Sequence, residues 1–245
     1  MLEFQLVLPC YNESKTLSRL LDEVVRAAEE AGFTSDRFQL ILVQNGSVDN
    51  SAAELERLKR QYGMWYSVVA LKVNAGYGGG LWAGLQTATA PYVAWSHADM
   101  QCSPRNAFLG LKRLQSTSGK CLVRGYRTDR DIKDRLVSRV FEFLSRLILG
   151  MRCKEVNAQP KVFHREFLNE LVSPPPHFGF DLYALYRASR SGYRQEFIEV
   201  TFPPRIHGVS NWAGTFVGRH RTILAMVRFM WSLMLSEGRI GCRTR

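Results

Sequence analysis

The sequence contains few cysteines, and their spacing matches neither a zinc site nor a disulfide framework. Its five cysteines are Cys10, Cys102, Cys121, Cys153 and Cys242, an odd number without a Cys-x-x-Cys pair. Paired spacings are typical of zinc sites and disulfide frameworks, so neither is indicated. We interpret all five as reduced thiols, which predicts a reducing compartment, most simply the cytoplasm.

Signals for export, membrane insertion and nucleic-acid binding are also missing. The first residues lead into an apolar segment, without the basic region, apolar core and cleavage site of a signal peptide. No helix-turn-helix, zinc-finger or RNA-binding signature is present. The apolar run 223–235 is shorter than the roughly 17 to 25 residues that span a bilayer. We therefore expect a cytoplasmic protein that binds no nucleic acid.

Acidic residues are scarce in the second half of the chain. Residues 1–100 contain 8 Lys and Arg against 11 Asp and Glu, a net charge of −3, whereas residues 101–245 carry a net charge of +14. The phosphates of a sugar nucleotide, a lipid phosphate or an anionic membrane surface would each match this basic half. A solvated basic surface without a function is the alternative.

What the sequence does contain is a repeated pattern of apolar segments that run into polar residues. Residues 4–14, 38–49 and 91–101 each begin as an apolar strand and end in polar or charged side chains. Helical patterns follow the first two, over residues 14–31 and 51–62. This alternation indicates an α/β fold with a parallel sheet, whose ligands bind outside the carboxyl ends of the strands. The polar clusters are therefore predicted to meet at one edge.

The third of these segments carries three potential metal ligands, His97, Asp99 and Gln101, at alternate positions. Side chains two residues apart on an extended strand point the same way, so the three could converge on one ion. A strand that simply runs into a polar turn is the alternative.

Together the motifs resemble a known family. The order Leu-Pro-Cys-Tyr-Asn-Glu-Ser, Gln-Asn-Gly-Ser-Val-Asp, Asn74-Ala-Gly-Tyr-Gly-Gly-Gly80 and His-Ala-Asp-Met-Gln is similar to that of the inverting glycosyltransferases of family 2. The branch that it resembles contains dolichol-phosphate mannose synthase-like and bacterial polyprenyl-phosphate or polysaccharide glycosyltransferases. The resemblance runs from Phe4 to Trp212 and implies the GT-A fold, with a mostly parallel central sheet flanked by helices. We expect a catalytic domain over residues 1–211 and a basic amphipathic helical tail over 212–245.

The activity that the resemblance implies is sugar transfer from a nucleotide-diphosphate sugar. The acceptor would be a cell-envelope polysaccharide or glycolipid, or a polyprenyl phosphate. A divalent cation, Mn²⁺ or Mg²⁺, would neutralise the diphosphate that leaves. Relatives have Asp-Ala-Asp-Leu-Gln at the metal site, so Asp99 and Gln101 match and His97 replaces an acid. Imidazole suits Mn²⁺ better than Mg²⁺. Two alternatives remain: His97 only packs near the site, or the chain is a degenerate, non-catalytic homologue.

The nucleotide site is predicted from the first, second and Gly-rich motifs. Relatives have two acids where this chain has Gln44 and Asn45, whose amides can both donate and accept hydrogen bonds. Glu13 would accept a hydrogen bond from the base or ribose, or would only favour a helix N-terminus. The Gly-rich segment would precede a helix over residues 81–89, or form a purely structural turn. The nucleotide-binding residues implied are Pro9, Tyr11, Asn12, Glu13, Asn45, Ser47, Gly76, Gly78 and Ala98.

The acceptor side is predicted less sharply. Asp181, at the start of a helix, would be the general base if the acceptor is a sugar hydroxyl, whereas a lipid phosphate is already an anion and needs no base. An amphipathic helix is expected over residues 134–150. The resemblance places these further residues at the diphosphate or acceptor: Arg127, Arg135, Lys161, Arg205, His207, Ser210 and Asn211.

The tail carries arginines around the apolar run 223–235, which includes Phe229 and Trp231. This pattern suits a helix lying in a membrane interface. The alternative is a helix that packs on the domain or on a second subunit, in a homo-oligomer.

Overall fold

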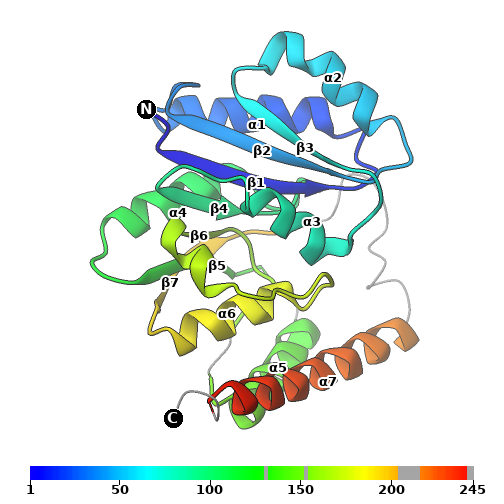
Figure 1. Ribbon diagram of the computed structural model, residues 1–245, viewed down its shortest axis with the longest axis vertical. Helices are drawn as coiled ribbons and strands as arrows, with labels where there is room; N and C mark the ends of the chain where they lie inside the picture. Colours follow the sequence, from blue (N-terminus) through cyan, green and yellow to red (C-terminus); the bar gives the residue numbers. More distant parts are fainter. Residues whose placement is uncertain (130–131, 152–153, 204–215, 242–245) are drawn as a thin grey trace.

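A seven-stranded sheet forms the centre of the fold (Figure 1). The computed structural model describes residues 1–129, 132–151, 154–203 and 216–241. In chain order its elements are β1 (Phe4–Cys10), α1 (Leu17–Glu30), β2 (Phe38–Asn45), α2 (Ser51–Tyr62), β3 (Tyr66–Leu71), α3 (Gly76–Leu85), β4 (Tyr92–Trp95), α4 (Arg105–Gln115), β5 (Cys121–Arg127), α5 (Ile132–Leu149), β6 (Lys161–His164), the 3₁₀ helix η1 (Arg165–Glu170), α6 (Phe180–Arg190), β7 (Arg194–Val200) and α7 (Phe216–Gly241).

The strand order is β3-β2-β1-β4-β6-β5-β7. β1, β2, β3 and β4 are mutually parallel, β5 and β7 are parallel, and β6 runs antiparallel to β4 and β5. The predicted mostly parallel sheet is therefore confirmed. After β3 the chain crosses to the other side of β1 to form β4, and such a switch point opens a crevice at the carboxyl ends of the two strands.

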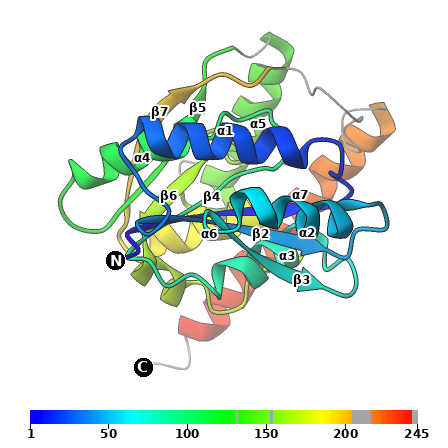
Figure 2. The ribbon, with the colours of Figure 1, turned by 90° about the horizontal axis from the view of Figure 1, so that it is seen from above.

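Side chains on the strands alternate between two cores, because successive residues of a strand point to opposite faces. Leu6 and Leu8 of β1 pack with α1, α2 and α4, whereas Val7 packs with α3 and α6. In Figure 2, α1 and α4 lie on the opposite side of the sheet from α3. Both faces are covered, as the near-continuous apolar strands require.

The helix predicted over residues 51–62 has those bounds in the structure, but the Gly-rich segment differs from the prediction. α3 begins at Gly76, so the glycines form its first turns instead of a loop before residue 81. A Cβ on Gly80 would come within 2.6 Å of the Asn45 side chain, and one on Gly84 within 2.5 Å of Val43. The glycines thus let the helix approach the sheet closely, which propensity alone does not reveal.

α5 and α7 lie side by side at the end of the molecule away from β3 (Figure 1). The inner face of α7 contributes Met226, Met230 and Leu233 to the core that contains α6. The tail is thus a helix that packs on the domain, and it extends beyond both ends of the apolar run 223–235. Among the described residues, no helix combines the length and the apolar character that crossing a membrane requires.

Candidate active site

The loops that follow β1 and β2 are tied together at the carboxyl edge of the sheet. The Asn12 N–H donates to Ser47 Oγ at 3.1 Å, and the Val48 N–H donates back to Asn12 Oδ1 at 3.0 Å. Asn12 adopts a left-handed φ of 58°, which an asparagine tolerates. The first two predicted clusters therefore meet, as expected for parallel strands. Tyr11, beside them, exposes 44% of its surface and is open to a ligand.

Asp49 anchors the same loops. Its carboxylate accepts hydrogen bonds from the Ser14 N–H at 3.1 Å and from the N–H and hydroxyl of Ser51 at 3.0 and 2.5 Å. Partial burial acts to raise the pKa of Asp49, but these hydrogen bonds outweigh it and the pKa is lowered. Glu13 lies in the turn before α1, where its Oε2 accepts a 2.9 Å hydrogen bond from the Thr16 hydroxyl.

Asn45 joins the end of β2 to the start of α3. Its Nδ2 donates to the Gly76 carbonyl at 3.0 Å, and its Oδ1 accepts from the Ala75 N–H at 3.0 Å. An aspartate could accept the second hydrogen bond but could not donate the first. The asparagine found where relatives carry an acid therefore has a structural use. Sequence reasoning interpreted it only as a ligand contact.

The glycines of α3 face protein rather than open space. A Cβ on Gly76 would lie 2.5 Å from the Pro176 carbonyl oxygen, and one on Gly78 would lie 2.2 Å from that of Pro175. Gly76 also has a left-handed φ of 76°. These contacts favour the structural interpretation of the Gly-rich segment, while its predicted approach to a nucleotide stays a prediction. The remaining nucleotide residues lie at the carboxyl edge, Pro9 within β1 and Ala98 buried after β4.

The predicted metal ligands do not lie on a strand. β4 ends at Trp95, and Met100 adopts a left-handed φ of 62° between Asp99 and Gln101. The assumption of strand alternation across these residues was therefore wrong, because a turn sets their directions. Asp99 Oδ1 accepts a 3.2 Å hydrogen bond from the Gln101 N–H, and Gln101 Nε2 donates to the Pro203 carbonyl at 3.2 Å.

The donor set of this turn is one imidazole, one carboxylate and one amide. A protein site of this kind fits Mn²⁺ or Mg²⁺ only when phosphate oxygens and waters supply further ligands. Within the described ranges, no three or more His, Cys, Asp or Glu side chains gather as a metal-binding group. The residues therefore suit a cation that arrives with a diphosphate, rather than one that the protein holds alone.

Asp181 lies on the first turn of α6, where the structure buries it completely. Lys161 of β6 is equally buried, and its Nζ lies 2.5 Å from Asp181 Oδ1. The same oxygen accepts hydrogen bonds from Trp95 Nε1 and Gln159 Nε2, both at 3.1 Å. Burial acts to raise the pKa of Asp181, but the charge and hydrogen bond of Lys161 outweigh it and the pKa is lowered. Asp181 is thus a stable anion and a weak base.

Tyr77 connects this buried ion pair to His97. Its hydroxyl accepts a 3.4 Å hydrogen bond from Gln159 Nε2, and its ring stacks on the imidazole of His97 with centroids 5.4 Å apart. Burial and the negative charge of Asp181 hold the pKa of Tyr77 well above its usual value, so the phenol stays protonated. Sequence reasoning missed Tyr77, Gln159 and Trp95. One signal was present: buried Tyr and Trp need partners for their O–H and N–H groups.

Of the residues predicted at the diphosphate or acceptor, Arg127 lies at the end of β5, whereas Lys161 is buried on β6 beside Asp181. Arg127 Nε lies 2.6 Å from Glu155 Oε2, and the buried Arg124 donates to the Glu155 carbonyl at 3.1 Å. A pocket of about 450 Å³ opens here, and its lining residues are Tyr126, Arg127, Thr128, Ser138, Arg139, Glu142, Lys154 and Glu155. The side chain of Arg135 and all of Arg205, His207, Ser210 and Asn211 lie outside the described residues.

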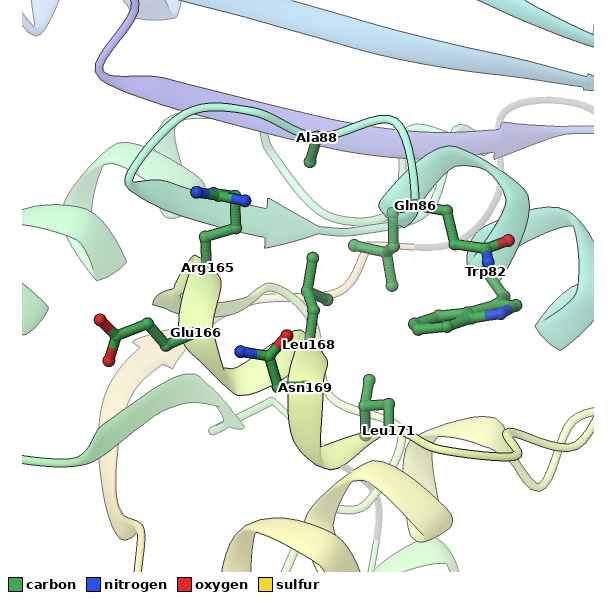
Figure 3. A pocket seen from close by; sticks show the side chains of 9 residues that line it. Trp82, Gln86, Ala88, Arg165, Glu166, Leu168, Asn169 and Leu171 are labelled. Atoms are coloured by element: carbon green, nitrogen blue, oxygen red, sulfur yellow. The ribbon is translucent and has the colours of Figure 1, made fainter.

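A second pocket, of about 410 Å³, has none of the predicted site residues in its lining (Figure 3). Trp82 of α3 and Gln86, just after that helix, face residues Arg165, Leu168 and Asn169 of η1 across it. The Arg165 N–H donates to the Pro91 carbonyl just before β4. This pocket therefore lies at the amino end of β4, opposite the edge where parallel sheets bind their ligands.

The chain is similar to known proteins over most of its length. Residues 5–173 match the model of glycosyl transferase family 2. Over 175 residues the chain is 26% identical to a dodecaprenyl-phosphate galacturonate synthase of Rhizobium johnstonii, a match that covers 69% of this chain and half the length of that relative. It is also 28% identical over 236 residues to an uncharacterized glycosyltransferase of Mycobacterium tuberculosis, covering 93% of this chain and 96% of the relative.

Solved structures with similar folds also include glycosyltransferases. A glucosyl-3-phosphoglycerate synthase of M. tuberculosis, in complex with Mn²⁺, UDP and glucosyl-3-phosphoglycerate, gives a TM-score of 0.66 at 20% identity, covering 96% of this chain and 79% of that one. A mannosyltransferase of Pyrobaculum calidifontis with GDP-Man and Mn²⁺ gives 0.61 at 18% identity, covering 84% and 58%. The chain therefore belongs to glycosyl transferase family 2, as a transferase with the GT-A fold.

Proposed function

We propose that this protein transfers a sugar from a nucleotide-diphosphate sugar to an acceptor that is already an anion, foremost a polyprenyl phosphate. One observation carries the choice of acceptor. Asp181, the candidate general base, is fully buried and its carboxylate is paired with Lys161. Attack by a neutral hydroxyl needs a base that accepts the proton, whereas a phosphate oxygen at neutral pH has none to lose.

On the donor side, the nucleotide would bind at the joined loops after β1 and β2, with Tyr11 against the base. His97, Asp99 and Gln101 would hold a divalent cation together with the diphosphate. That cation would neutralise the charge that develops on the leaving diphosphate. The relatives solved with Mn²⁺ and a nucleotide support this part of the proposal.

On the acceptor side, the pocket between β5 and α5 would receive the phosphate. Arg127, Arg139 and Lys154 outnumber the two glutamates that line it. A lipid phosphate would place this pocket at the inner face of the cytoplasmic membrane. The Rhizobium relative, named for a dodecaprenyl-phosphate product, supports an acceptor of this chemistry.

The deciding experiment compares two acceptors that differ only in the phosphate. The purified chain is incubated with Mn²⁺, a panel of labelled nucleotide sugars, and a short water-soluble prenyl phosphate or the corresponding prenol. We expect labelled product with the phosphate alone. Transfer to a neutral sugar hydroxyl at a comparable rate would overturn the choice of acceptor. If the metal stimulates turnover of none of the donors, the result would instead favour the non-catalytic homologue.

A further inference from the structure

Two neighbouring helices present apolar side chains to the outside. The exposed apolar residues, which we name the α5–α7 apolar surface, are Val140, Phe143, Leu147, Leu224, Trp231 and Leu235. Each exposes between 49% and 71% of its surface. They recur three, four or seven residues apart, so each helix carries them as one stripe.

The stripes point away from the domain. On α7, Met226, Met230 and Leu233 face the core, on the opposite side of the helix from Leu224 and Trp231. Phe229 also faces inward, because its ring lies 5.0 Å from that of His177. Of the two aromatic residues in the apolar run 223–235, only Trp231 therefore lies on the outer face. On α5, Ile148 faces the core while Phe143 and Leu147 do not.

The surface is basic as well as apolar. Arg139 and Arg146 border the stripe on α5, and Arg228 lies within the stripe on α7, one turn from Leu224. Among the described side chains of the two helices, these three arginines stand against one acidic residue, Glu142. Two copies brought together through this surface would place like charges face to face, which disfavours a dimer.

We propose that the α5–α7 apolar surface docks on an anionic lipid surface. Leu and Phe side chains would enter the acyl boundary, Trp231 would lie at the headgroups, and the arginines would reach the lipid phosphates. This inference rests on the exposed residues and charges of α5 and α7, and not on sugar transfer. It does deepen the proposed function, because Ser138, Arg139 and Glu142 of α5 also line the acceptor pocket.

The test is co-sedimentation of the full chain with vesicles of phosphatidylcholine alone or with about one third phosphatidylglycerol. We expect binding to the anionic vesicles only, weakening as salt screens charges beyond about 10 Å at 0.1 M. The double variant Phe143→Gln, Trp231→Gln should lose roughly tenfold or more of this affinity. Met64→Gln with Val172→Gln is the matched control, since these apolar residues are each 77% exposed elsewhere, and it should bind like the wild type.

A second pair of substitutions tests the charges. Arg146→Gln with Arg228→Gln should weaken binding roughly 25-fold, at about 1 kcal/mol for each arginine near the surface. Wild-type protein that ignores anionic vesicles at low salt overturns the inference. So does a dimer, seen by sedimentation equilibrium, that the Phe143→Gln, Trp231→Gln variant dissolves. Turnover with a water-soluble acceptor should be unchanged in that variant, so failure of docking and failure of the proposed activity are distinguishable.

Discussion

Two aspartates of this protein carry the same charge in contrasting settings. Asp49 is half-buried at the edge of the sheet, where the backbone and hydroxyl of Ser51 and the backbone of Ser14 satisfy it. Asp181 is fully buried against β4 and β6, where Lys161 pairs with its Oδ1 and its Oδ2 has no hydrogen-bond partner. Both pKa values are lowered, yet neutral hydrogen bonds lower the first and an opposite charge lowers the second. Breaking these interactions should therefore lower the stability of the fold modestly at Asp49 and severely at Asp181.

The largest effect is expected for Lys161→Met. This change leaves the Asp181 carboxylate buried without its cation, which costs about 3–5 kcal/mol of stability. Desolvation then dominates and raises the pKa of Asp181, so the variant should be most stable at acid pH and lose stability as pH rises past the carboxyl range. Urea unfolding across pH measures both. Equal stability of wild type and variant at pH 7 would contradict the assigned ion pair.

The double variant Lys161→Met, Asp181→Leu tests the same ion pair. Because both charges are removed, much of the lost stability should return, as for buried pairs replaced by apolar residues. A double-mutant cycle from the same unfolding data gives the coupling between the two side chains. Additive losses would show that the two residues act independently.

Asp99 lies in the turn after β4 and would act through a cation. Asp99→Asn should lower metal-stimulated donor turnover by about 100-fold or more while leaving the unfolding midpoint unchanged. His97→Asp restores the acid that relatives carry and should shift the preference from Mn²⁺ toward Mg²⁺. Titrating each metal against turnover checks both. Wild-type turnover by Asp99→Asn would show that the metal lies elsewhere.

The ring of Tyr77 stacks on His97, whereas its hydroxyl accepts a hydrogen bond from Gln159. The ring and the hydroxyl can therefore be tested separately. Tyr77→Leu removes the stack on His97, and an aromatic pair contributes about 0.5–1.5 kcal/mol. The Mn²⁺ concentration for half-maximal turnover should then rise about 2- to 10-fold. Tyr77→Phe keeps the ring and should stay close to the wild type. A similar shift in both variants would show that the hydroxyl, rather than the stack, positions His97.

A modest effect on stability is expected for Asp49→Asn. The lowered pKa of Asp49 means that its contribution is present above the unfolded carboxyl pKa and is lost as pH falls through the folded pKa. We expect a loss of about 1 kcal/mol at pH 7 that disappears in acid, the opposite pH direction from Lys161→Met. A difference in stability that persists well below the carboxyl range would show that Asp49 acts through packing instead of charge.

By itself, the sequence determined the α/β class, the mostly parallel sheet and the meeting of the first two polar clusters. These features follow from local periodicity and from the rule that parallel strands end at one edge. The helix over residues 51–62 was also predictable, because its acidic first turn and basic last turn are local signals. The motif order was enough to indicate the family that residues 5–173 match.

Only the tertiary structure decided the roles that depend on segments far apart in the chain. The burial of Asp181 requires β4, β6 and α6 to converge, and no pattern around residue 181 reports the Lys161 side chain beside it. The start of α3 at Gly76 depends on how closely β2 and the 175–177 segment approach it. Amphipathic spacing predicted an apolar stripe on α5. Whether the fold covers that stripe or leaves it exposed depends on where neighbouring elements pack, and the structure leaves Phe143 and Leu147 facing outward.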